Sequence, residues 1–200
     1  MSKPILKSSR SAEEHHKGRH RYEHWYVDQQ VYFITARCRD RFPAFEKEEP
    51  KTVFWDRFNH YTQATGFLPI VTSLLDNHYH TLGFLETGLN LKTLMQRLHG
   101  SVSKLVNDLL PERRREFFRD KKGKEYFDGC IRDETQFRRA YRYTWMQSRR
   151  HGVLWDYTKY VHEHVGMELE DAVRFCLERK GFLEGVPYKR YQRKDPARPT

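Results

Sequence analysis

The stretch 76–80, Asp-Asn-His-Tyr-His, places two histidines one residue apart, directly after a two-residue turn signal. Apolar and β-branched residues flank it from 67 to 85, which predicts a β-hairpin whose second strand begins at the histidines. Along a strand, residues i and i+2 share a face, so His78 and His80 would project together while Tyr79 packs on the opposite face. Two imidazoles placed in this way can bind one divalent ion.

A second segment, 132–150, has acidic residues at its start, basic residues at its end and Gly152 just beyond, which are helix start and stop signals. At helical spacing its apolar residues form a packing stripe, and its polar residues form a separate stripe. Tyr143 and Gln147 stand one turn apart on the polar stripe. The packing stripe contains Phe137, Ala140, Tyr141, Thr144 and Trp145, and the polar stripe contains Gln136, Arg139, Tyr143, Gln147 and Arg150.

With both segments in view, the chain resembles the single-tyrosine (Y1) transposases of the HUH nuclease superfamily, most closely the REP-associated tyrosine transposases. The resemblance extends over 22–154 and includes the order of the elements as well as their motifs. Tyr143 falls where the family carries its catalytic tyrosine, and Gln147 occupies the position of its third metal ligand. The other matching segments are 31–35 as the first strand, 77–80 as the paired-histidine motif and 126–134 as the lead into the tyrosine helix.

This resemblance implies a metal-dependent single-stranded DNA endonuclease and strand transferase that cleaves beside DNA hairpins of the REP or transposon-end type. Tyr143 would attack a phosphodiester to give a 5′-phosphotyrosine link and a free 3′-hydroxyl, without an added high-energy cofactor. His78, His80 and Gln147 would hold one ion on the phosphate. Imidazole and amide-oxygen ligands with open positions suit Mg²⁺ or Mn²⁺ better than structural zinc.

Two positions depart from the family pattern. Gln147-Ser148 replaces an Asn-Pro, although Gln offers the same carbonyl oxygen on a longer arm, and Tyr79 replaces a small aliphatic residue. These differences leave an alternative open, which is a catalytically inactive or domesticated basic nucleic-acid-binding protein with the same fold. A second histidine pair, His162 and His164, flanks a glutamate and is expected on an exposed loop or short helix, outside the site.

The charge balance indicates a polyanionic partner. The chain carries a formal net charge of +10, and neutralising phosphates with Lys and Arg releases condensed counterions. Nucleic acid is the leading partner, and an anionic membrane surface is a distant second. In the charge-dense loop 111–124, Phe117 and Phe118 either stack on bases or anchor the loop. The DNA-binding candidates are Arg113, Arg114, Arg115, Arg119, Lys121 and Lys122 in this loop, and Arg139 and Arg150 on the tyrosine helix.

Apolar periodicity predicts an α+β fold. A strand within 25–38, a helix over 50–65, the hairpin, a helix over 89–110 and a strand over 126–132 follow in order. This order predicts a ferredoxin-like or RRM-like antiparallel sheet with two helices on one face and the tyrosine helix near the other. We expect three parts, namely a flexible basic arm at 1–24, the catalytic domain at 25–154, and a C-terminal helix with a basic tail at 155–200.

Cysteine usage and hydropathy indicate a cytoplasmic, nucleoid-associated protein. The three cysteines are widely spaced and odd in number, which favours neither a disulfide framework nor a zinc ribbon. The N-terminus lacks an apolar signal-peptide core, and no window has the roughly 18 apolar residues needed to span a bilayer. The sequence leaves open a monomer or a homodimer, because the tyrosine helix can dock on its own sheet or on that of a neighbouring chain.

Overall fold

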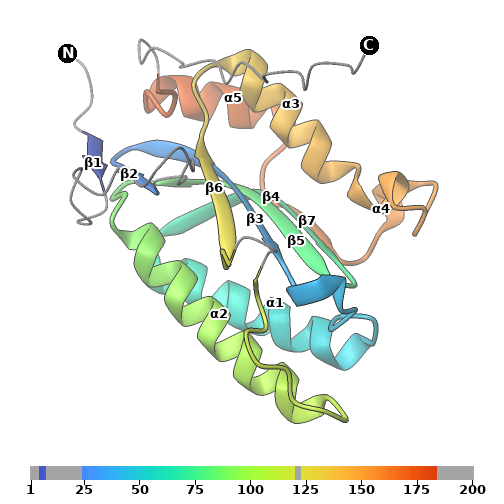
Figure 1. The fold of residues 1–200 in the computed structure, drawn as a ribbon. Helices are drawn as coiled ribbons and strands as arrows, with labels where there is room; N and C mark the ends of the chain where they lie inside the picture. The colour runs from blue at the N-terminus through green and yellow to red at the C-terminus, as the bar shows by residue number, and fades with distance from the viewer. Residues whose placement is uncertain (1–4, 8–23, 120–122, 184–200) are drawn as a thin grey trace, which may run out of the picture.

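The computed structural model describes residues 5–7, 24–119 and 123–183. Its centre is a five-stranded antiparallel sheet in the order β6-β3-β5-β4-β7 (Figure 1). Along the chain, a strand, a helix, two strands, a helix and a strand form the ferredoxin-like arrangement that the sequence predicts. The strands are β3 (Gln30–Arg37), β4 (Phe67–Leu75), β5 (His78–Leu85), β6 (Tyr126–Cys130) and β7 (Glu163–Val165).

The central strand β5 positions the histidine pair. Every residue of β5 is buried, and the strand pairs with β3 on one side and with β4 on the other. The predicted hairpin is confirmed, because residues 76–77 form the turn between β4 and β5. Across the ladder to β3, Arg37 pairs with His78 and Thr35 pairs with His80. Both histidines are therefore held in register with residues of a neighbouring strand.

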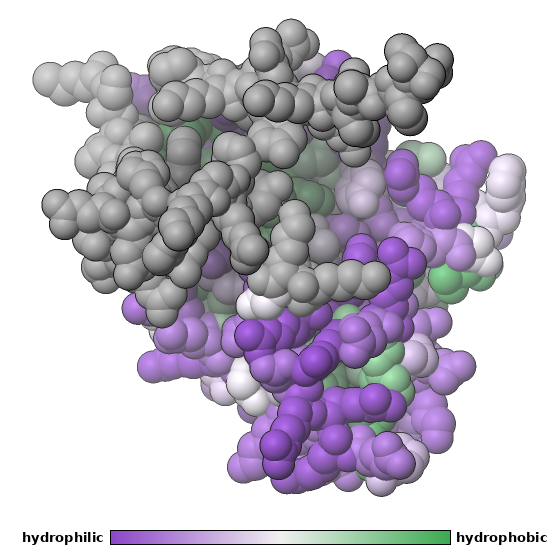
Figure 2. Space-filling view, in the orientation of Figure 1, coloured by the Kyte–Doolittle hydropathy of each residue, from purple (hydrophilic) through white to green (hydrophobic). Residues whose placement is uncertain are grey.

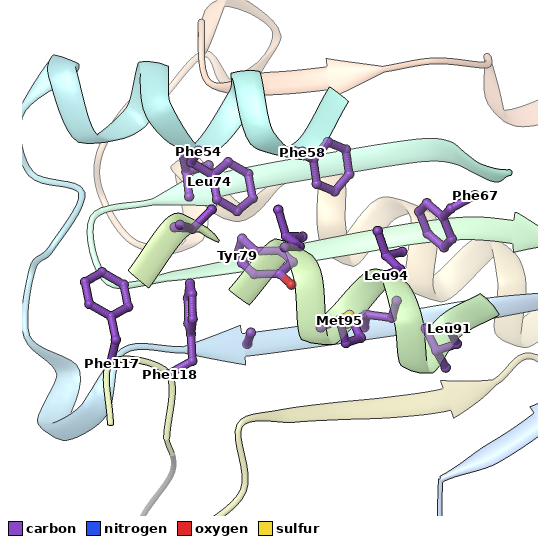
Figure 3. Packing of buried hydrophobic residues seen from close by; sticks show 14 of the residues in the cluster. Phe54, Phe58, Phe67, Leu74, Tyr79, Leu91, Leu94, Met95, Phe117 and Phe118 are labelled. Carbon is purple, nitrogen blue, oxygen red and sulfur yellow. The ribbon is translucent and has the colours of Figure 1, made fainter. Parts of the chain in front are cut away.

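One face of the sheet is covered by α1 (Glu48–Thr65) and α2 (Asn90–Leu109), which lie together at the bottom of Figure 1. Gly66 ends α1 with φ 70°, a left-handed conformation that glycine adopts without steric cost. Tyr79 is fully buried in the core of this face and its hydroxyl lies 2.9 Å from His99 Nε2, so it packs as predicted. Other members of this core, drawn in Figure 3, are Phe54, Phe58, Phe67, Leu74, Leu91, Leu94, Met95, Phe117 and Phe118.

The opposite face is covered by α3 (Glu134–Trp145) and α5 (Leu169–Glu178), as the sequence predicts for the tyrosine helix (Figure 1). Asp133 caps α3, because its carboxylate accepts a hydrogen bond from the backbone N–H of Gln136. The predicted helix over 132–150 is not continuous. At Met146 the backbone has φ −94° and ψ 18°, and a one-turn helix, α4 (Gln147–Arg150), follows. Periodicity does not reveal this break, because the side chains on both sides of it continue the same stripe.

The segment after residue 154 contributes to the same sheet. β7 pairs antiparallel with β4, and α5 packs against α3. The prediction of a loop or short helix at His162 and His164 is wrong, because residues 163–165 add an edge strand. His162 is buried and lies 3.0 Å from a carboxylate oxygen of Glu48, whereas His164 is exposed. A three-residue edge strand is too short to show the alternation by which strands are recognised in sequence.

Most of the predicted N-terminal arm and basic tail lies outside the described residues. Within the arm, β1 (Ile5–Lys7) pairs antiparallel with β2 (Trp25–Val27) in a separate two-stranded sheet. Residues 8–23 and 184–200 are not described, and neither are Lys121 and Lys122 of the charged loop. In the part of the chain that is described, no helix is long and apolar enough to cross a membrane.

Candidate active site

His78 and His80 lie on the sheet face that α3 covers, opposite the buried side chain of Tyr79. Their ring centroids are 5.1 Å apart, and each histidine is only 4% exposed to solvent. Tyr143 of α3 lies next to His80, with 5.2 Å between the ring centroids. One chain therefore brings together the tyrosine and the two histidines that the sequence singles out in separate segments.

Hydrogen bonds orient both imidazoles. His78 Nδ1 lies 2.6 Å from Asn77 Oδ1, and because an amide oxygen only accepts, Nδ1 donates and Nε2 of the neutral ring keeps its lone pair. His80 Nδ1 lies 2.7 Å from Thr35 Oγ1, and the His80 ring stacks on Phe33 at a centroid distance of 5.8 Å. Contacts of this kind fix the rings of metal-binding histidines in proteins.

Burial keeps the two imidazoles neutral. It is the main cause that lowers the pKa of His78 to about 4, and the neighbouring His151, Arg37 and Arg41 act in the same direction. Burial also holds the pKa of His80 well below its usual value, with a smaller contribution from His78. Because metal ions bind the neutral form of imidazole, both side chains are in the ligand form at neutral pH.

Gln147 is the first residue of α4 and is fully buried beside His78. Its Nε2 donates a 2.6 Å hydrogen bond to the backbone carbonyl of Tyr143. Its Oε1 is buried, has no hydrogen-bond partner of good geometry among the described residues, and faces the His78 ring closely enough to raise the pKa of that imidazole against the larger effect of burial. An unpaired buried amide oxygen costs about 1–3 kcal/mol, and a cation bound at this position would offset that cost.

The available donors fit an ion with open coordination positions. They are two neutral imidazoles and one amide oxygen, from His78, His80 and Gln147. Over residues 5–7, 24–119 and 123–183, no group of three or more His, Cys, Asp or Glu side chains is arranged to hold a metal ion. The residues present therefore fit the Mg²⁺ or Mn²⁺ that the sequence resemblance implies, and they do not form a closed zinc site.

Tyr143 is the accessible member of the site. Tyr143 is 37% exposed to solvent, and the guanidinium of Arg150 lies 4.7 Å from the centre of its ring. Tyr141, two residues earlier on α3, is fully buried, and its hydroxyl donates a 3.0 Å hydrogen bond to the carbonyl of Met167. Of these two tyrosines, only Tyr143 can meet a substrate that approaches from solvent.

Two basic residues at the site were not among the sequence candidates. The His151 ring lies 4.9 Å from the His78 ring, and Arg37 is close enough to depress the pKa of His78 and His80. His151 stands four residues after Gln147 and one residue beyond the predicted helix, so extending the polar stripe by one position would have included it. Arg37 could be found only from the strand register, in which it pairs with His78.

The predicted DNA-binding cations of the tyrosine helix both lie near Tyr143. Arg139 is exposed on α3, one turn before Tyr143, and Arg150 covers the tyrosine ring. An exposed Arg on each side of Tyr143 is compatible with contacts to two phosphates of a bound strand.

The charged loop is ordered by its aromatic residues. Phe117 and Phe118 are buried in the core of the α1–α2 face, so of the two sequence alternatives they anchor the loop. Arg113 forms an ion pair with Asp108, and Arg119 forms one with Glu116. Arg113, Arg114 and Arg115 line a cleft near the end of β3. From 111 to 119 this segment is thus a folded part of the surface.

Comparison with known proteins identifies the fold. No family model matches the chain, and no curated protein matches it. Among solved structures, that of a REP-associated tyrosine transposase bound to a REP hairpin is similar, with a TM-score of 0.60 and 13% sequence identity. The match covers 72% of this chain and 82% of the other. The chain therefore has the fold of a REP-associated tyrosine transposase, as its motifs predict.

Proposed function

We propose that this protein is a metal-dependent single-stranded DNA endonuclease and strand transferase with Tyr143 as its nucleophile. The observation that carries the proposal is the meeting of an exposed tyrosine, two oriented neutral imidazoles and an unpaired buried amide oxygen. These groups come from β5, α3 and α4 of a single chain. A protein that used this fold only to bind DNA would gain nothing from that combination.

His78, His80 and Gln147 would hold one Mg²⁺ or Mn²⁺. The bound ion would supply positive charge to the non-bridging oxygens of a phosphodiester, where negative charge develops during attack. The residues themselves orient the site, because Asn77 and Thr35 fix the two rings and the Gln147 amide is tied to the backbone of Tyr143.

Tyr143 would attack the phosphorus through its phenolic oxygen. A bond forms between that oxygen and phosphorus, and the bond from phosphorus to the 3′-oxygen breaks, which leaves a 5′-phosphotyrosine and a 3′-hydroxyl. The phenolic proton can pass to water because Tyr143 is exposed, and the departing oxygen gains its proton from solvent. Arg37 beside the histidines and Arg150 over the Tyr143 ring would stabilise the negative charge of the phosphate. Attack by another 3′-hydroxyl reverses the step and joins two strands.

The substrate would be single-stranded DNA that carries hairpins. The structurally similar transposase is bound to a REP hairpin, and the net charge of +10 favours a polyanionic ligand. Because one chain supplies every group named above, a monomer would be sufficient for cleavage, and the protein would act in association with the nucleoid.

The covalent intermediate gives the direct test. Labelled hairpin-bearing single-stranded DNA is incubated with the protein and Mn²⁺, and the denatured protein is examined for attached label. We expect label on the wild type and none on Tyr143→Phe, which keeps the ring and removes only the attacking oxygen.

Tyr141→Phe is the matched control, because it removes a hydroxyl from the same helix at a buried position. It should retain the adduct. An adduct on Tyr143→Phe would assign the nucleophile to another residue. Absence of an adduct from the wild type on all hairpin substrates would favour the alternative of a nucleic-acid-binding protein without catalysis.

A further inference from the structure

A second candidate site lies beyond the end of β3, on the other side of the sheet from Tyr143. It is a cleft of about 280 Å³ between the end of β3, the short helix η1 (Arg39–Arg41) and the segment 113–117. Figure 2 shows mostly hydrophilic side chains, with some hydrophobic ones between them, over α2 and the segment that follows it. The lining of the cleft includes Cys38, Phe42, Phe117 and the three arginines 113–115, together with one acidic residue, Asp40, which is paired with Arg39.

The walls of the cleft are fixed by hydrogen bonds. Asn107 at the end of α2 binds Arg114 twice, since its Oδ1 accepts from the Arg114 N–H at 2.7 Å and its Nδ2 donates to the Arg114 carbonyl at 3.0 Å. The N–H of Arg39 donates to the carbonyl of Phe117 at 2.9 Å, and Cys38 forms an isolated bridge with Phe118. The arginines therefore project from an ordered backbone.

The cleft combines positive charge with an aromatic surface. Arg39 is paired with Glu116, and Arg113 is paired with Asp108. Arg114 instead lies over the Phe42 ring, 4.1 Å from its centre. Neither Arg114 nor Arg115 forms an ion pair with a carboxylate in the described part of the chain. Stacked guanidinium and aromatic planes next to an uncompensated cation are the groups that bind an unpaired base and its phosphate.

The cleft is connected to the candidate active site through a short chain of contacts. Arg37 and Cys38 are consecutive, and on extended backbone they point to opposite sides, Arg37 toward the two histidines and Cys38 into the cleft. The carbonyl of Arg41 in η1 accepts a 3.2 Å hydrogen bond from Asn77 Nδ2, while Asn77 Oδ1 accepts from His78. A strand that leaves Tyr143 around this end of the sheet would therefore reach the cleft.

We propose that this cleft binds one unpaired nucleotide of the DNA strand whose phosphate lies at Tyr143, with the base against Arg114 and Phe42 and the phosphate on Arg115. This inference rests on the proposed function and extends its substrate site. The volume of about 280 Å³ lies just below the range of small-ligand pockets, about 300–1,000 Å³, and suits one nucleotide and not a duplex. An inorganic anion would use the charge but not the aromatic surface.

The test measures binding without catalysis. The full chain, in EDTA, is titrated into a fluorescein-labelled twelve-residue oligothymidylate, and affinity is read from anisotropy. Arg114→Ala should weaken binding about tenfold, since it removes both a cation and a stacking plane. Arg114→Lys should fall between Arg114→Ala and the wild type, because it keeps the charge and loses the planar group.

Arg97→Ala is the matched control, since Arg97 is an exposed cation on α2 that does not line the cleft. It should weaken binding about twofold through charge alone. In parallel, an oligothymidylate that contains 5-iododeoxyuridine is cross-linked by light, and mass spectrometry should find the label on the peptide that contains Phe42.

The outcomes separate this inference from the proposed function. Equal effects of Arg114→Ala and Arg97→Ala, with no label at Phe42, overturn the cleft, and an adduct on Tyr143 would still support catalysis. Dependence on Arg114 without any adduct supports the cleft and counts against the nuclease. Displacement of the oligothymidylate from Arg114 by inorganic phosphate at equal ionic strength assigns a simple anion site and overturns nucleotide binding. Failure to bind the oligothymidylate at all overturns the cleft, whereas the adduct on hairpin-bearing DNA decides the nuclease.

Discussion

Buried histidines lie on both faces of the sheet, and the two environments differ in their neighbours. His99, on the α1–α2 face, bonds to the Tyr79 hydroxyl and stacks on Phe118 with 4.1 Å between ring centroids. His78 and His80 are equally buried, at 4% exposure each, but they adjoin an exposed tyrosine. Burial alone does not distinguish a functional histidine from one in a core. The groups that face the ring do.

Unpaired polar atoms sharpen this comparison. Within the described residues, Gln147 Oε1 and the hydroxyls of Thr144 and Ser148 are buried on α3 and α4 without hydrogen-bond partners. Ser73, which pairs with His80, and Glu163, which pairs with Ser73, add further unpaired oxygens on the same side. On the other face the unpaired atoms among the described residues are His99 Nδ1, Trp55 Nε1 and Gln30 Oε1, since Gln30 alternates on β3 with the same parity as Tyr32. Buried polar atoms in a protein core are usually hydrogen-bonded. The sheet face that carries Tyr143 therefore keeps unpaired polar side chains that selection for stability alone would not favour.

The largest expected effect distinguishes the two faces by chemistry. His78→Ala or His80→Ala should lower metal-dependent cleavage by at least about 100-fold, because the charge at the phosphate is lost, while the fold and most DNA binding remain. His99→Phe, which fills the ring position on the other face, should cleave at nearly the wild-type rate once folded. The measurement is the rate of adduct formation, with circular dichroism to confirm folding. Unimpaired, metal-dependent cleavage by both alanine variants would place the ion elsewhere.

A smaller effect is expected from removing the Gln147 amide oxygen on the sheet face that carries Tyr143. Gln147→Met should lower Mn²⁺ affinity about 10-fold to 100-fold. Without metal, its free energy of unfolding should stay within about 1 kcal/mol of the wild type, because loss of the hydrogen bond to Tyr143 is offset by loss of the unpaired atom.

Calorimetric titration with Mn²⁺ and urea unfolding measure the two quantities for Gln147→Met. Ser148→Ala is its neighbouring control, since it removes an unpaired hydroxyl that belongs to no candidate ligand. Its Mn²⁺ affinity should equal that of the wild type. Equal Mn²⁺ affinity of Gln147→Met and wild type would remove Gln147 from the ligand set.

The same comparison explains what the sequence could predict. The hairpin at 67–85 and the helix over 50–65 were predicted correctly, because alternation, helical spacing and turn residues are local signals. The placement of Tyr79 in the core followed from strand alternation, because Tyr79 stands between His78 and His80 and points to the opposite face. The meeting of Tyr143 with the histidines followed only from the family resemblance, since no local rule relates residues more than 60 positions apart.

Features that depend on tertiary contacts were missed. The break at Met146 lies inside a continuous stripe, and the edge strand at 163–165 is too short to alternate. Arg37 joins the site through cross-strand register, which one sequence does not specify. His151 is the exception, because its helical spacing from Gln147 was visible and only the many histidines of the chain obscured it.

The smallest effect concerns the acid sensitivity of the α1–α2 face. Burial lowers the pKa of His99 to about 3, whereas the unfolded chain has the ordinary value of about 6.5. Between these values the unfolded state binds a proton that the folded state does not, so stability falls as pH falls, by about 1.4 kcal/mol per unit. His99→Phe should be about 1 kcal/mol less stable than wild type at pH 7, because Tyr79 loses its hydrogen-bond partner. At pH 5 the order should reverse by about 1 kcal/mol, since only the wild type has lost about 2 kcal/mol through His99. Urea unfolding at both pH values measures the crossing, and parallel curves would show that His99 is not held neutral by its core.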